Sequence, residues 1–164
     1  MGAWQLDHDV VALGPLRLAV QRIARPHWKP DGALRSWGLA PLHLEGQTLL
    51  VPCGADEALW LGAWLEDDAA RASLRVTDPA CDASATTELP REFQLTALRS
   101  TDARAMPLAL PDGGSRSLRV EIDCEGRRAS MELLLLVPAA WAARSARPAP
   151  DPLGQPPPLP PLLG

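Results

Sequence analysis

The sequence contains no tyrosine, and it has only one phenylalanine, Phe93, and one lysine, Lys29. Six tryptophans are therefore nearly all of its aromatic side chains, and we expect them to supply most of the large aromatic volume of the hydrophobic core. Apart from Lys29 and the histidines, all basic residues are arginines. Together with abundant alanine, leucine and proline, this bias is typical of bacterial-like, high-GC coding, so it is not by itself a sign of arginine-mediated recognition.

The motifs that would fix a reaction are also missing. There is no G-x-S-x-G, no G-x-x-x-x-G-K-[ST] and no G-x-G-x-x-G. The one compact set of metal-capable groups is Asp7-His8-Asp9, and an extended strand would point His8 away from both carboxylates. We therefore predict no metal site and no cofactor, and we favour a non-catalytic protein over an enzyme of unassigned type.

Charge and cysteine content limit which classes of partner and which cellular compartment the sequence favours. A formal charge of −4 and a pI near 5.3, without a basic stripe, do not favour nucleic acid. Three cysteines without a C-x-x-C pair predict neither a disulfide framework nor a zinc site. The longest apolar run, Leu133–Ala143, is too short to cross a bilayer, and no signal peptide is recognisable. We expect a cytoplasmic protein without a membrane span.

The clearest structural pattern is a β-hairpin over 118–133. Apolar residues alternate with charged ones from Leu118 to Cys124, and a second alternating stretch follows Glu125-Gly126. A two-residue turn centred on Glu125-Gly126 sets Ile122 opposite Ala129, Val120 opposite Met131, Leu118 opposite Leu133, Asp123 opposite Arg128 and Arg119 opposite Glu132. One register makes one face apolar and pairs opposite charges on the other face, so we predict that register.

Other short apolar stretches predict further strands, separated by proline and glycine. They are Leu16–Ile23, Gln47–Val51, Ala58–Leu65, Ala72–Thr77 and Phe93–Leu98. This pattern is typical of an all-β protein, either a mostly antiparallel β-sandwich or an open barrel. We expect one β-rich domain over 1–145, followed by a proline-rich tail over 146–164. Leu133–Val137 is apolar on both faces and must be covered on both sides, by the chain itself or by a partner.

Two groups of tryptophans are candidate binding residues. The first lies in a proline-containing stretch that reads as a loop, and its candidates are His27, Trp28, Arg35 and Trp37. The second group is Trp60 and Trp64, which alternate onto one face of a predicted strand. Both groups have a structural alternative, in which the tryptophans plug the end of the sandwich or fill the core. A small-ligand or carbohydrate-binding module on these surfaces is our second functional hypothesis.

The tail favours polyproline II structure, because eight of the eighteen prolines lie in 146–164. Pro158 and Pro161 have P-x-x-P spacing, and Leu159 lies between them as an apolar anchor. Such a segment docks into aromatic-lined grooves or serves as an inert linker. Docking to another protein and docking onto the chain's own tryptophans both remain open. Our first hypothesis is an adaptor or assembly subunit that presents a β surface and this tail to another protein, or to a second copy of itself.

Overall fold

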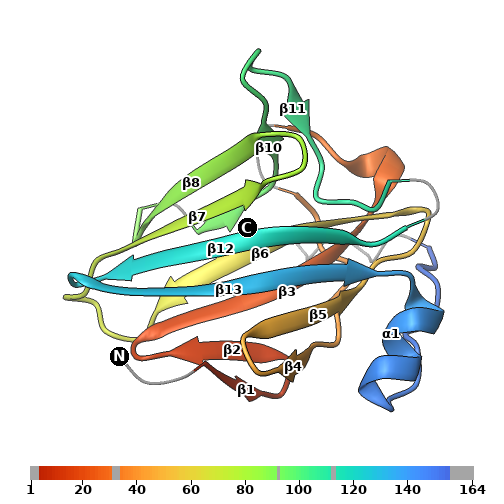
Figure 1. Cartoon of the computed structure of the whole chain (residues 1–164), viewed down its shortest axis with the longest axis horizontal. Coiled ribbons are helices and arrows are strands. Elements are labelled where there is room, and N and C mark those ends of the chain that lie inside the picture. The colour runs from red at the N-terminus through yellow and green to blue at the C-terminus, as the bar shows by residue number, and fades with distance from the viewer. Residues whose placement is uncertain (1–3, 31–33, 92, 112–113, 156–164) are drawn as a thin grey trace, which may run out of the picture.

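In the computed structural model, which describes residues 4–30, 34–91, 93–111 and 114–155, the chain forms two facing β-sheets and one short α-helix (Figure 1). The five-stranded sheet A has the order β1 (Gln5–Asp7), β2 (Val10–Leu13), β3 (Leu16–Ala24), β6 (Glu57–Leu65), β9 (Gln94–Leu95). The eight-stranded sheet B has the order β11 (Ala105–Met106), β10 (Leu98–Arg99), β8 (Ala83–Leu89), β7 (Ala72–Asp78), β12 (Arg116–Cys124), β13 (Arg127–Leu136), β5 (Thr48–Pro52), β4 (His43–Glu45). Neither sheet closes into a barrel, so the sandwich is confirmed.

The main core lies between the two sheets, and alternation along the strands determines which side chains enter it. In β6, Leu59, Leu61 and Ala63 point inward, and they pack against the inward side chains of β12 and β13. The inward residues of β12, Leu118 to Cys124 at every second position, are all buried. Fully burying an aliphatic side chain is worth about 1.5–3 kcal/mol, so each large aliphatic side chain in these two rows stabilises the fold by an amount of that order.

The predicted hairpin is confirmed in its register. All five cross-strand pairs that the sequence indicated occur between β12 and β13. Glu125 and Gly126 both have positive φ, as a two-residue turn of this kind requires. The cost of the left-handed conformation at Glu125 is offset locally, because its carboxylate accepts a 2.6 Å hydrogen bond from the backbone of Arg71.

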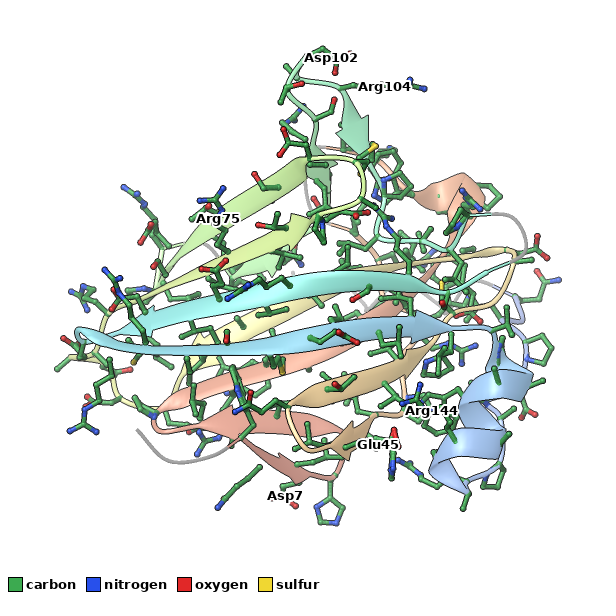
Figure 2. The ribbon with its side chains drawn as sticks, in the orientation of Figure 1. Asp7, Glu45, Arg75, Asp102, Arg104 and Arg144 are labelled. Atoms are coloured by element: carbon green, nitrogen blue, oxygen red, sulfur yellow. The ribbon has the colours of Figure 1, made fainter. Side chains whose placement is uncertain are left out.

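The two-sided apolar end of β13 is covered by the chain itself. Leu133 and Leu135 face the main core, whereas Leu134 and Leu136 contact a second cluster built on the fully buried Trp141. Trp141 belongs to α1 (Pro138–Ser145), and its indole donates a 3.0 Å hydrogen bond to the carbonyl of Leu50. An ion pair between Arg144 of α1 and Glu45 of β4 also fastens the helix to the sheet edge (Figure 2).

Two expectations about strands need correction. The stretch Phe93–Leu98 is not one strand: it divides into β9, in sheet A, and the start of β10, in sheet B, and Phe93 itself is 59% exposed. The sequence reading also missed β8, which has few large apolar residues. In β8, Ala83, Thr87 and Leu89 are buried because the whole strand pairs with β7, so tertiary pairing overrides a weak local pattern.

Candidate functional site

The outer face of sheet A carries a group of tryptophans at one end of β3 and β6. Because Leu59 and Leu61 point into the core, Trp60 points outward, and it packs there with Ile23, Leu34, Ala58 and Ala109. Trp28 and Trp37 are half-buried against this group. We call Trp28, Trp37, Trp60 and the apolar side chains packed with them the Trp cluster.

The indole N–H groups of the Trp cluster differ in whether they have a hydrogen-bond acceptor. The indole of Trp28 donates a 2.9 Å hydrogen bond to the carbonyl of Thr96, which ties the loop to the β9–β10 connection. The indole N–H of Trp60 is buried and finds no acceptor within the described parts of the chain. His27 packs edge-on against Trp37, with ring centroids 5.2 Å apart. The Trp cluster therefore covers part of the outer face of sheet A, and Trp37 lies at its outer border.

A segment of the tail, residues 147–154, crosses the border of the Trp cluster. The Nη2 of Arg22 donates a 2.8 Å hydrogen bond to the carbonyl of Asp151, and the indole Nε1 of Trp37 donates one of 3.3 Å to the carbonyl of Gly154. At the start of the segment, Arg147 donates a 2.6 Å hydrogen bond to the carbonyl of Leu42. We call residues 147–154 the tail segment.

The contacts of the tail segment repeat every three residues. The accepting carbonyls belong to positions 151 and 154, and the side chains that are half-buried belong to Pro150 and Leu153. Arg147 lies three residues before Pro150 and so extends the series of side chains that face the protein. Its guanidinium lies 5.3 Å from the ring centroid of Trp141. A period of three is that of a polyproline II helix, whose equivalent groups recur on one side at every turn.

The donor that holds Asp151 is itself held firmly. Arg22 and Glu57 continue the inward rows of β3 and β6 at one end of the sheet, and their side chains are only 12% and 7% exposed. Two hydrogen bonds join them, from Nη2 to Oε1 at 2.6 Å and from Nε to Oε2 at 3.2 Å. A bidentate pair fixes the plane of the guanidinium, so the remaining donor capacity of Nη2 points to the tail segment without further ordering.

The predicted site residues thus separate into groups. His27, Trp28, Trp37 and Trp60 come together, and Arg35 lies half-buried in the same loop. Trp64 does not join them: it is 41% exposed, and its indole donates a 3.3 Å hydrogen bond to Glu66. Pro158, Leu159 and Pro161 lie outside the described residues.

The histidines and acidic residues form no common centre. His8 is exposed in the turn between β1 and β2 and is hydrogen-bonded at 2.6 Å to its neighbour Asp7. Over the ranges of the chain that are described, no three His, Cys, Asp or Glu side chains gather closely enough to hold a metal ion. In the same parts of the chain, no helix is long and apolar enough to span a bilayer.

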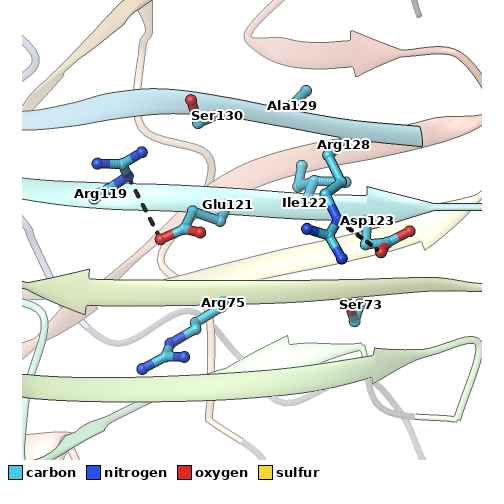
Figure 3. Close-up of a pocket in the computed structure, with 9 residues that line it drawn as sticks. All are labelled: Ser73, Arg75, Arg119, Glu121, Ile122, Asp123, Arg128, Ala129 and Ser130. Carbon is cyan, nitrogen blue, oxygen red and sulfur yellow. Dashed lines mark ion pairs between the residues drawn. The ribbon is translucent and has the colours of Figure 1, made fainter. Parts of the chain in front are cut away.

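The outer face of sheet B carries a shallow polar cleft of about 400 Å³ (Figure 3). Its charged side chains are largely exposed, and most of them pair with each other: Arg119 lies 3.5 Å from Glu121, and Arg128 lies 3.5 Å from Asp123. Exposed pairs of this kind contribute little energy and leave the charges close to balance. This face is a solvated sheet surface, and it does not single out a ligand.

Comparison with protein-family models, with curated proteins and with solved structures finds no match to this chain. The functional argument therefore rests on the geometry of its own residues.

Proposed function

We propose that this chain is a non-catalytic protein-interaction subunit whose surface around Trp37 and Arg22 binds extended proline-rich segments. The observation that carries the proposal is the pair of carbonyls at 151 and 154, three residues apart, which accept hydrogen bonds from Arg22 and Trp37. Aromatic grooves with a donor aimed at a ligand carbonyl are a recurring way of reading polyproline II segments. The tail segment is then the resident occupant of this surface.

The contacts define what a competing ligand needs. It needs carbonyls at two positions three residues apart, and apolar or proline side chains in the positions of Pro150 and Leu153. A basic residue in the place of Arg147 would reach the carbonyl of Leu42 and Asp9, at 2.6 and 3.4 Å in the docked tail. A second copy of this chain carries the same segment, so self-association through exchanged tails is included in the proposal.

Tethering gives the chain's own tail an advantage over a partner. A segment joined by a short connection competes at an effective concentration in the millimolar range. A partner must therefore bind tightly, or present several such segments, in order to displace it. We place the protein in the cytoplasm, since its three cysteines are unpaired thiols, which suits a reducing compartment.

The test uses the full chain and a fluorescent peptide with the sequence of residues 146–155. Two substitutions in the chain's own tail, Arg147→Ala and Leu153→Ser, should free the surface and strengthen binding of the peptide in trans, measured by fluorescence anisotropy. In that background Trp37→Phe keeps an aromatic ring, though a smaller one, and removes the donor. We expect it to weaken binding roughly two- to tenfold, the value of one hydrogen bond.

The matched control is Trp64→Phe, the same substitution at an exposed tryptophan in β6 of sheet A, and it should leave peptide binding unchanged. Absence of peptide binding to the freed surface, or equal effects of the two Trp→Phe substitutions, would contradict the proposal.

The alternative of a carbohydrate or small-ligand module has one supporting observation, the open face of Trp64, which projects from β6 outside the Trp cluster. One exposed ring is a small platform. A shift of tryptophan fluorescence with a sugar, lost in Trp64→Phe and kept in Trp37→Phe, would favour this alternative.

A further inference from the structure

A second cleft lies apart from the contacts of the tail segment, among the β7–β8 turn, residues 106–111 and the start of β12. Its volume is about 530 Å³, within the range typical of small-molecule sites. The proposed peptide function makes no use of it.

A buried ion pair fixes the walls of this cleft. Arg116 of β12 lies 2.8 Å from the carboxylate of Asp78, the last residue of β7 before the β7–β8 turn. Its Nη1 also donates hydrogen bonds to the carbonyls of Pro107 and Ala109, at 3.0 and 2.9 Å. One side chain therefore ties together the three segments that line the cleft. A ligand that enters does not have to order these walls, and preorganisation of this kind favours binding.

Among the described residues, the lining is mainly apolar and carries one uncompensated positive charge. The apolar residues are Pro79, Ala80, Met106, Pro107, Ala109, Leu110 and Pro111. The charges of Arg116 and Asp78 offset each other. Arg25 also lines the cleft, and its guanidinium has no hydrogen bond or ion pair among the residues that the structure describes. The hydroxyls of Ser115 and Ser117 add polar groups to the lining.

From this combination we propose that the cleft binds a small apolar monocarboxylate, with the carboxylate at Arg25 and the apolar body against Met106, Pro107 and Leu110. The single net positive charge matches one negative charge, and the apolar wall matches a hydrocarbon body. A neutral apolar molecule would gain nothing from the exposed guanidinium, and a polyanion would meet only one free cation among the described lining residues.

Cys81 supplies a reporter for this cleft. It lines the cleft and is exposed, whereas Cys53 and Cys124 are buried. The experiment measures the rate at which uncharged iodoacetamide alkylates Cys81 in the full chain, at increasing concentrations of decanoate. We expect saturable protection by decanoate, with decanol about tenfold weaker, the lower value for a hydrogen bond to a charged group. Calorimetric titration of the same probes measures binding independently of the thiol.

Arg25→Gln should weaken decanoate binding about tenfold and leave decanol binding unchanged. The matched control is Arg127→Gln, an exposed arginine at the start of β13, beside the end of β12 that lies opposite Arg116, and it should change neither. Three results would overturn the proposal: no saturable binding of decanoate, equal binding of decanoate and decanol, or equal effects of the two Arg→Gln substitutions. Each is measured on folded protein, verified by circular dichroism.

Discussion

Alkaline pH should destabilise this protein through one thiol, that of Cys53. Burial raises the pKa of the Cys53 thiol from 9.0 to about 11, and the nearby carboxylate of Glu57 adds to the effect. The folded protein therefore favours the neutral thiol. This contribution to stability is complete below pH 9, where the unfolded chain also keeps its thiol protonated, and it is lost as the pH rises to 11.

The size of the loss follows from the width of that window. Each pKa unit corresponds to about 1.4 kcal/mol, so the difference between 9.0 and about 11 amounts to roughly 3 kcal/mol of unfolding free energy. Few other groups obscure it, since the chain has no tyrosine and one lysine, and arginine stays charged. The pKa of Cys124 is also raised, first by burial and then by its acidic neighbours, so it adds in the same direction.

Urea unfolding followed by circular dichroism, in reducing buffer at intervals between pH 8 and 11, measures this loss. Cys53→Ala should lower stability by about 1 kcal/mol at neutral pH and remove most of the decline above pH 9. Cys81→Ala, at an exposed position, is the control and should keep most of the decline. If Cys53→Ala retains the full pH dependence, burial of this thiol is not its cause.

Two further predictions concern buried side chains, both measured by urea unfolding. Trp141→Ala should cost about 3–5 kcal/mol, because it empties the cluster beneath α1 and leaves the Leu50 carbonyl without its donor; a loss below 1 kcal/mol would show that α1 contributes little. Asp78→Asn should cost about 3 kcal/mol at pH 7 by leaving Arg116 buried and unpaired. Burial alone would raise the pKa of Asp78, but hydrogen bonds from Arg116 and Ala80 lower it below 3.8, so the wild-type advantage over Asp78→Asn should persist at pH 5 and shrink as the pH falls below 3.8.

Local patterns were predictable from the sequence, and distant pairings were not. The hairpin of β12 and β13 could be read in full because both strands and their turn lie within twenty residues of each other. The parallel pairing of β13 with β5 has no local sequence pattern that predicts it. Both strands are apolar, and any other buried apolar strand would fit equally well beside either of them. The same argument explains β8, whose small and polar residues match a strand only when β7 is beside them.

At the candidate site, residue type alone predicts the aromatic residues. It does not predict that the Arg22 side chain donates a hydrogen bond to the tail segment. The sequence predicts Trp37 as a binding residue, but it does not single out Arg22. A signal existed: Leu16, Leu18 and Val20 define the inward row of β3, and Arg22 continues that row. A charged residue in an inward position predicts a buried partner, here Glu57, though it does not reveal the carbonyl of Asp151.

The pairing between β13 and β5 also has a consequence for the order in which the chain matures on the ribosome. Leu49, Leu50 and Val51 of β5 are fully buried, yet their neighbour β13 lies about half the chain length downstream. At 5–20 residues per second, β5 leaves the ribosome roughly 4–17 s before its partner. Throughout that interval an apolar strand with an open edge is available to other chains, so a holding chaperone is expected to matter more for synthesis of this protein than for its refolding.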